Sequence, residues 1–150
     1  MRVVIDMQGA QSESRYRGIG RYTLALVDSL LALNSNHEIV LLLNGELRDS
    51  ADALIRRYRS QLPDNNIVVF TPLDRVAWSV PDNAARARLM EPVRETVLAQ
   101  CAPDVLLITS LFEGYHDDAV TGLPEQEQGV PTAVIHYDLI PVLNPEYLSE

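Results

Sequence analysis

Residues 2–44 read RVVIDMQGAQSESRYRGIGRYTLALVDSLLALNSNHEIVLLLN and decide the fold class. They begin with a short run of branched apolar residues at 2–7 and end with a second apolar run at 37–44. Between the two lies a long segment, 19–34, whose leucines and valines recur at helical spacing over a wide arc. This strand–helix–strand order is typical of a parallel sheet with its crossover helix packed on one face.

The same alternation continues along the rest of the chain, which has the length of a single domain, 1–150. Ser50 is placed to cap one helix, and Pro92 is expected to break or kink another. Right-handed crossovers then predict an α/β fold with a doubly wound, Rossmann-like parallel sheet of strand order 3-2-1-4-5. Further strands are expected at 66–70, 104–110 and 131–138, further helices at 50–62, 84–101 and briefly around 117–122, and a loop at 71–83.

Composition excludes several classes of function. The net charge is −9 and all 12 basic residues are arginines, so there is no broad basic footprint for nucleic acid or anionic membrane. No apolar run approaches the ~20 residues that span a bilayer. Asp6 interrupts the first apolar run and no signal-peptide core follows, which predicts a cytoplasmic protein. The lone Cys101 excludes an internal disulfide and is expected to be buried at a helix end.

In an open parallel sheet, ligands bind beyond the carboxyl ends of the strands, where the strand order reverses. Here that point lies between the first and fourth strands. The sequence therefore predicts that residues 8–20, 110–114 and 136–138 meet at one edge of the sheet.

The first of these segments contains RYRGIGRYT, residues 15–23. Its glycines, Gly18 and Gly20, do not fit a dinucleotide fingerprint, because a loop separates them from the strand and the third glycine is missing. They still let backbone approach a ligand closely at a helix N-terminus. Three arginines gather where a helix disfavours cations, which favours an anionic ligand; an ordinary surface loop is the alternative. The arginines are Arg15, Arg17 and Arg21.

The other two segments hold polar candidates. Ser110 and Glu113 follow the fourth strand closely enough to join a site. In an extended strand His136 and Asp138 share one face, and His136 is either an acid/base group or a histidine satisfied inside the sheet. A solvated loop is favoured over a metal site for His116, Asp117 and Asp118, and exposed helix faces are expected for Arg56, Arg57, Arg59, Arg86, Arg88 and Arg94.

Together, RVVIDMQG, RGIGRYT, PDVLLITSLFEG and YDLIPVLNPEYL resemble the N-terminal domain of bacterial GT-B glycosyltransferases of family 4. Within that family the chain is most similar to mannosyltransferase-like members that build surface polysaccharides. The resemblance runs from Arg2 to Leu148.

The resemblance implies an acceptor-side domain that acts with a C-terminal, donor-binding domain absent from these residues. It implies metal-independent, retaining transfer of a hexose from a nucleotide sugar such as GDP-mannose to a glycan or lipid-linked acceptor, in the cytoplasm or at the inner membrane. His136 and Asp138 would be catalytic, although many members have histidine where Tyr137 stands. The substrate-binding residues would be Gly18, Ile19, Gly20, Arg21, Ser110, Glu113, Gly114 and Tyr137.

Other functions stay open at this point. The chain could be a self-contained nucleotide-binding or oxidoreductase-type domain, although the fingerprint is missing. It could be a noncatalytic interaction domain. A glycoside hydrolase that uses Glu113 and Asp138 would need both acids to flank one sugar.

Overall fold

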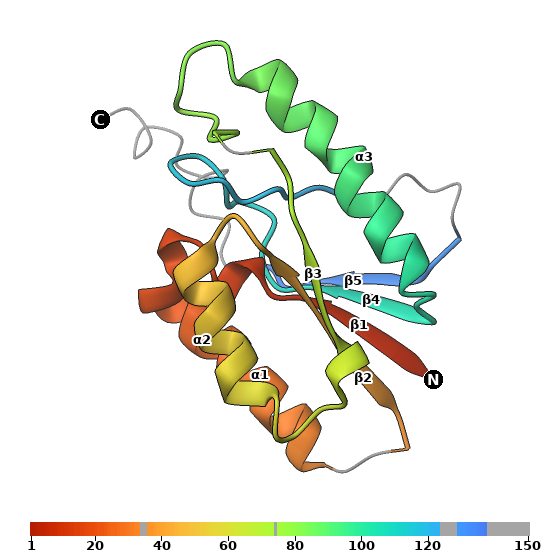
Figure 1. Cartoon of the computed structure of the whole chain (residues 1–150). Helices are drawn as coiled ribbons and strands as arrows, with labels where there is room; N and C mark the ends of the chain where they lie inside the picture. Colours follow the sequence, from red (N-terminus) through yellow and green to blue (C-terminus); the bar gives the residue numbers. More distant parts are fainter. Residues whose placement is uncertain (34–35, 74, 124–128, 138–150) are drawn as a thin grey trace.

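Five parallel strands form one sheet in the order β3-β2-β1-β4-β5, as Figure 1 shows. The computed structural model describes residues 1–33, 36–73, 75–123 and 129–137. β1 is central, and its Ile5 lies opposite Leu41 on one side and Leu107 on the other. The predicted doubly wound, Rossmann-like sheet and its strand order are confirmed. The strands are β1 (Arg2–Asp6), β2 (Glu38–Asn44), β3 (Ile67–Phe70), β4 (Val105–Ile108) and β5 (Thr132–Val134).

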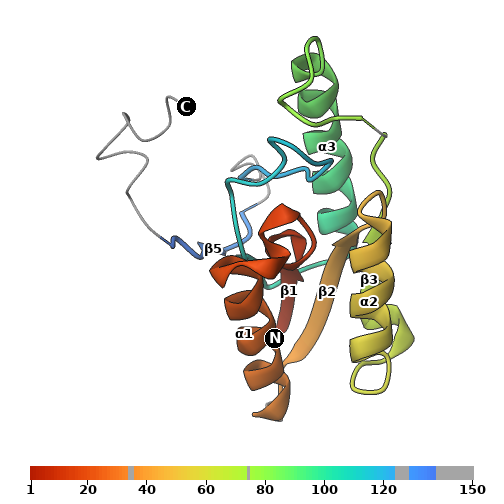
Figure 2. The same cartoon turned by 90° about the vertical axis from the view of Figure 1, so that its left-hand side faces the viewer.

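Helices cover both faces of the sheet. Figures 1 and 2 show α1 and α2 on one face and α3 on the other. The loop after β1, predicted without regular structure, contains two short 3-10 turns. The helices are α1 (Gly18–Ala32), α2 (Arg48–Tyr58) and α3 (Ala84–Gln100), and the 3-10 turns are η1 (Gln8–Ala10), η2 (Glu13–Tyr16) and η3 (Asp64–Asn66).

Alternation along the central strands divides the core in two. Ile5 faces the cluster under α1 and α2, which includes Val27 and Tyr58. Its neighbour Val4 faces the cluster under α3, which includes Met90 and Leu98. Because successive strand residues point to opposite faces, near-continuous apolar strands are what a sheet covered on both sides requires.

The predicted helix starts and stops need correction. Ser50 does not cap α2: the helix begins two residues earlier with Leu47 at its N-cap, and the Ser50 hydroxyl donates to the Leu47 carbonyl at 2.8 Å. Leu47 cannot cap with its side chain, so local sequence gave no signal there. α3 runs through Pro92 as one helix.

Of two further predictions, the one for residues 117–122 is wrong and the one for Cys101 is confirmed. Residues 111–123 contain no helix, so the short helix expected near 117–122 is wrong. Their backbone is committed instead to contacts with other loops, described below. Cys101 is buried at the end of α3, as predicted, and burial raises the pKa of its thiol.

Tyr58, in the part of the core under α1 and α2, makes the free energy of unfolding depend on pH in the alkaline range. Its side chain is buried and its hydroxyl donates to Asp28 Oδ1 at 3.0 Å. Burial raises the pKa of Tyr58 from 10.0 to about 12. The protonated phenol thus stabilises the fold fully below the unfolded-state pKa, and this contribution is lost as pH rises from about 10 towards 12.

We expect the free energy of unfolding to fall on the alkaline side by up to about 1.4 kcal/mol per pH unit from this group. Tyr58→Phe should be less stable at neutral pH, because it loses the bond to Asp28, but its stability should decline less steeply. Urea unfolding of both proteins across the alkaline range measures the two slopes. Equal slopes would show that Tyr58 does not carry this dependence.

Candidate functional site

The loops after β1 and β4 meet at the carboxyl edge of the sheet through the Glu113 carboxylate. Ser110 Oγ donates to Glu113 Oε1 at 2.7 Å, and Ser12 Oγ donates to Oε2 at 2.5 Å. Both serines are buried. Two hydroxyl donors on one carboxylate fix its orientation. Glu113 therefore stands as an oriented carboxylate at the predicted switch point.

Tyr137 brings the segment after β5 to the same place. Its hydroxyl donates to the Thr109 carbonyl at 2.9 Å and lies 3.4 Å from the Ile19 carbonyl. Burial raises the pKa of Tyr137, so the phenol stays protonated and remains a donor. The three segments that were predicted to meet thus do so; the third of them is described up to Tyr137.

Tyr137→Phe should lower the free energy of unfolding by about 1 kcal/mol, the net worth of one intramolecular hydrogen bond. The substitution removes the donor to Thr109 and leaves the ring in contact with Tyr22, whose centroid lies 5.8 Å away. Chemical denaturation measures the effect. Unchanged stability would show that this hydroxyl does not help to hold the three segments together.

Packing requires a glycine at only one of the two glycine positions of RYRGIGRYT. Gly20 is buried, and a Cβ built on it would lie 2.3 Å from the carbonyl oxygen of Arg15, so the packing of α1 on η2 requires a glycine. Gly18, the first residue of α1, is exposed, and a Cβ there would meet nothing within 4 Å. The chain's own packing therefore does not explain a glycine at 18.

The N-terminus of α1 is open. Its N-cap residue, Arg17, makes no side-chain cap, and the first N–H groups of a helix have no partner within it. Arg15 is turned away, because its guanidinium donates to the carbonyls of Gln11 and Ser12. Arg17 and Arg21 are exposed and have no ion-pair partner in the part of the chain that the structure describes. Two arginines without an ion-pair partner among the described residues thus flank an uncapped helix end.

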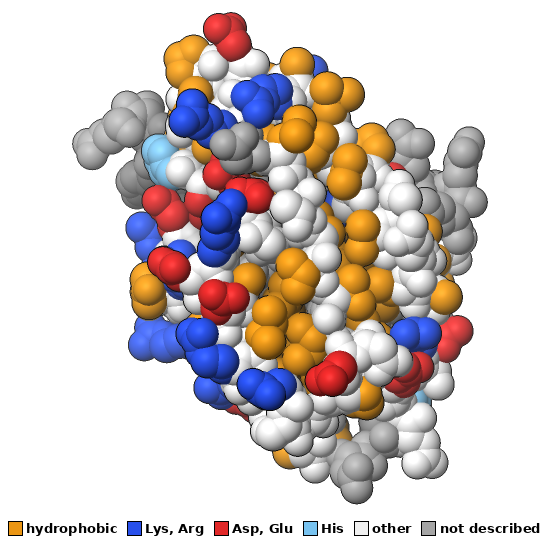
Figure 3. Space-filling view, in the orientation of Figure 1, with side chains coloured by type: hydrophobic (Ala, Val, Ile, Leu, Met, Phe, Trp, Pro, Cys, Tyr) orange, Lys and Arg blue, Asp and Glu red, His pale blue; other side chains and the backbone are white. Residues whose placement is uncertain are grey.

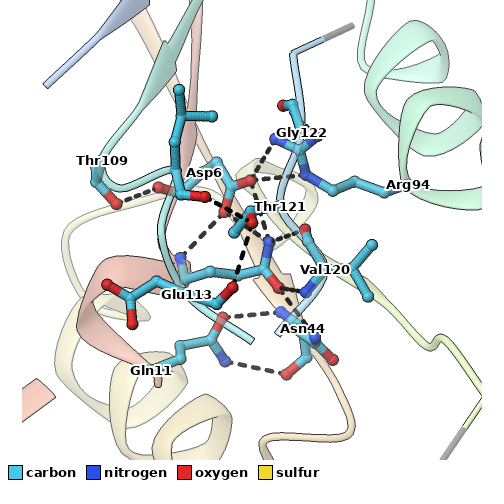
Figure 4. Close-up of polar contacts among 11 residues, drawn as sticks. Asp6, Gln11, Asn44, Arg94, Thr109, Glu113, Val120, Thr121 and Gly122 are labelled. Atoms are coloured by element: carbon cyan, nitrogen blue, oxygen red, sulfur yellow. Dashed lines mark hydrogen bonds and ion pairs between the residues drawn. The ribbon is translucent and has the colours of Figure 1, made fainter. Parts of the chain in front are cut away.

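Beneath these loops lies a buried ion pair between β1 and α3, drawn in Figure 4. Arg94 Nε donates to Asp6 Oδ2 at 2.8 Å, and Arg94 Nη2 lies 2.6 Å from the same oxygen. Both side chains are at most 2% exposed. The expectation that Arg94 lies on an exposed helix face is therefore wrong. Buried charges are retained only when they are paired, and Asp6 supplies the pair.

Buried amides extend this ion pair into a network across the end of the sheet. The Gln8 side chain donates to the carbonyl of Val120 at 2.6 Å and accepts from its N–H at 2.7 Å. Asn44 Nδ2 donates to Gln8 Oε1 at 3.0 Å, which joins the end of β2 (Figure 4). Gln8 Nε2 also reaches Asp6. The network fastens residues 111–123 onto the strand ends that carry the site.

The remaining candidates take separate places. His136 is exposed, and its ring centroid lies 6.0 Å from that of Phe112, edge to face, rather than against Glu113. Asp138 lies outside the described residues. Gly114 has φ of +89°, where glycine is favoured, and a Cβ on it would lie 2.3 Å from the Ala119 carbonyl. Gly114 therefore shapes the loop. Ile19 contributes its carbonyl near Tyr137.

Asp117 and Asp118 were predicted to be solvated, but they fasten neighbouring loops. Asp118 Oδ1 accepts from the N–H groups of Val76 and Ala77, and Asp117 Oδ2 accepts from Glu13 N at 2.7 Å. Among the described residues, no three His, Cys, Asp or Glu side chains are grouped to hold a metal ion. Within the same residues, no helix is long and apolar enough to cross a membrane.

The buried network of Asp6, Gln8, Asn44 and Arg94 was not predicted from the sequence. One signal was available: a carboxylate inside an apolar strand needs a buried partner. Residue spacing alone could not select that partner from the 12 arginines of the chain.

Comparison with curated proteins finds relatives that are all mannosyltransferases by name. The serotype-specific mannosyltransferase WbdA of Escherichia coli is 33% identical over an alignment covering 100% of this chain and 18% of that protein. Two further E. coli proteins of the same name are each 29% identical over 76% of this chain and 14% of their own length.

The chain thus spans less than a fifth of the curated relatives it matches. No protein-family model matches it. No solved structure matches it either. Over its whole length, this chain is homologous to part of an E. coli mannosyltransferase.

Proposed function

We propose that this chain is the acceptor-side, N-terminal domain of a retaining GT-B glycosyltransferase of family 4. The complete enzyme would transfer a hexose, mannose by preference, from a nucleotide diphosphate sugar such as GDP-mannose to a glycan or lipid-linked acceptor. Homology to part of a mannosyltransferase supports the reaction class. The Rossmann-like sheet, with its loops gathered at the switch point, supports the placement of the site.

The observation that carries the proposal is the open start of α1. Gly18 leaves space that none of the described residues fills within 4 Å of a built Cβ, and the helix end beside it is uncapped. Glycosyl transfer places growing negative charge on the departing diphosphate. Free N–H groups at a helix N-terminus and the side chains of Arg17 and Arg21 would stabilise that charge. Without an anion, two cations at this end would be unfavourable by ~0.3–1 kcal/mol each.

The other site residues take supporting roles in this proposal. Glu113, oriented by Ser12 and Ser110, would accept hydrogen bonds from sugar hydroxyls at the carboxyl edge of the sheet. Tyr137 would position the segment that carries His136 and Asp138, because its hydroxyl is already bound to Thr109. His136 is exposed and free to approach the transferred sugar. Gly20 and Gly114 would contribute indirectly, because they allow the backbone conformation and close packing of the segments that form the site.

An assay of the isolated chain beside the complete protein tests this proposal. With GDP-mannose and an oligosaccharide acceptor, the 150-residue chain should show no transfer, because most of the donor site is expected in a second domain. The complete protein should transfer mannose with retention of the anomeric configuration. Turnover by the 150-residue chain alone would contradict the division into two domains, and failure of the complete protein with every nucleotide sugar would contradict the reaction class.

A further inference from the structure

A cavity lies away from the switch point, between η2, α1 and α2. Its volume is about 380 Å³, and its apolar floor is made by Ala10, Leu24, Ala53 and Leu54. An adjoining cavity of about 360 Å³ extends it to the loop after β2. We call the two together the α1–α2 groove. None of Ser110, Glu113 or Tyr137 lines it, so the groove is separate from the site described above.

The rim of the groove is polar and carries both basic and acidic side chains. Arg15, Tyr16, Asp49 and Arg57 surround the floor. Arg57 Nη2 is paired with Asp28 Oδ2 at 2.5 Å, while Arg15 is held by backbone carbonyls.

At the far end of the groove Arg48 lies 3.9 Å from Glu46. Two of the three arginines that line the groove are thus paired with a carboxylate, and the third, Arg15, is held by backbone carbonyls. On the side of the molecule over α2, both basic and acidic side chains lie at the surface (Figure 3). Such a rim does not favour a phosphate or another anion, and a neutral polar ligand suits it better.

The shape and chemistry of the groove fit a sugar ring. A pyranose has a face of C–H groups, which an apolar floor can cover, and a rim of hydroxyls, which carboxylate and guanidinium groups can bind. The Tyr16 side chain is 79% exposed beside the Arg15 guanidinium, which lies 4.6 Å from its ring centroid. Its ring is thus available at the rim for contact with a second sugar. The volume lies within the ~300–1,000 Å³ range of small-molecule sites.

From these features we infer that the α1–α2 groove binds a neutral saccharide and holds a stretch of the acceptor glycan remote from its reacting end. The inference rests on the proposed function for the identity of the glycan, but the groove's binding of a saccharide can be measured without any transfer.

The test is an NMR titration of the 150-residue chain with α-mannotriose. We expect saturable shifts of the Asp49, Ser50 and Ala53 amide signals, with a dissociation constant on the order of 1 mM. Ala53→Met should weaken binding at least ~10-fold, because it fills the floor from an exposed helix position while methionine keeps good helix propensity. Ala25→Met, at an exposed position of α1 outside the groove, is the matched control and should bind as the wild type does.

The outcomes separate this inference from the proposed function. Absence of shifts, or shifts confined to residues 110–114 and 136–137, would overturn the groove as a saccharide site, whatever the complete protein transfers. Equal binding by Ala53→Met and Ala25→Met would overturn it as well. Shifts at the groove in a chain whose complete protein transfers no sugar would keep the groove and reject the proposed function.

Discussion

Replacing Arg94 by methionine should lower the free energy of unfolding by about 3–5 kcal/mol, because it leaves the Asp6 carboxylate buried without its cation. The pair is almost fully excluded from solvent, and Arg94 also donates to the Gly122 carbonyl at 3.2 Å. Methionine retains the unbranched shape of the arginine stem, so the loss reports the charge more than the volume. Urea or guanidinium denaturation measures the change.

Arg56→Met is the matched control for this substitution, because Arg56 is exposed on α2. We expect a change within about 0.5 kcal/mol there. In Arg94→Met, residues 111–123 should also lose protection from hydrogen exchange, since Arg94 and Gln8 both bind their carbonyls. Equal stability of Arg94→Met and Arg56→Met would contradict the buried ion pair.

Gly20→Ala should destabilise the protein by about 1–3 kcal/mol, as overpacking does, although glycine-to-alanine changes inside helices ordinarily stabilise. The reason is backbone contact: the new Cβ would lie 2.3 Å from the carbonyl oxygen and 2.4 Å from the Cα of Arg15. Backbone cannot turn aside as the end of a flexible side chain can, so η2 must move. Thermal and chemical unfolding measure the loss.

Gly18→Ala provides the opposite case two residues away on the same helix. Its Cβ would meet no atom within 4 Å, so stability should stay the same or rise by up to about 1 kcal/mol. If both substitutions proved equally harmless, the close packing of α1 on η2 would be contradicted. If both proved equally harmful, Gly18 would have a structural reason, and the argument for a ligand beside it would fail.

The sheet was predictable because its signals are local and repeated. Apolar runs such as IVLLL at 39–43 are bounded by polar residues, and the crossover rule then leaves few possible topologies. Element ends were less predictable where capping is absent, as at Leu47. The segment 111–123 was missed because its conformation depends on bonds to Gln8, Glu13 and Val76 from distant parts of the chain.

The site was predictable as a place but not as a set of contacts. The switch-point rule brought Ser12, Glu113 and Tyr137 to one edge of the sheet. It could not tell that Gly20 is needed for packing while Gly18 is not, since that difference depends on where the backbone of Arg15 lies. Nor could it identify Arg94 as the ion-pair partner of Asp6, because the two residues are 88 positions apart in the sequence.

Whether the open start of α1 holds the donor's diphosphate is best measured by the kcat/KM of the complete protein carrying Gly18→Val. A Cβ at this position meets none of the described residues within 4 Å, and the methyl groups of valine would occupy the space beside the first N–H groups of α1. We expect kcat/KM to fall on the order of 100-fold, comparable to the loss of a charge-stabilising donor, with an unchanged melting temperature. Wild-type kcat/KM in a folded Gly18→Val protein would contradict it.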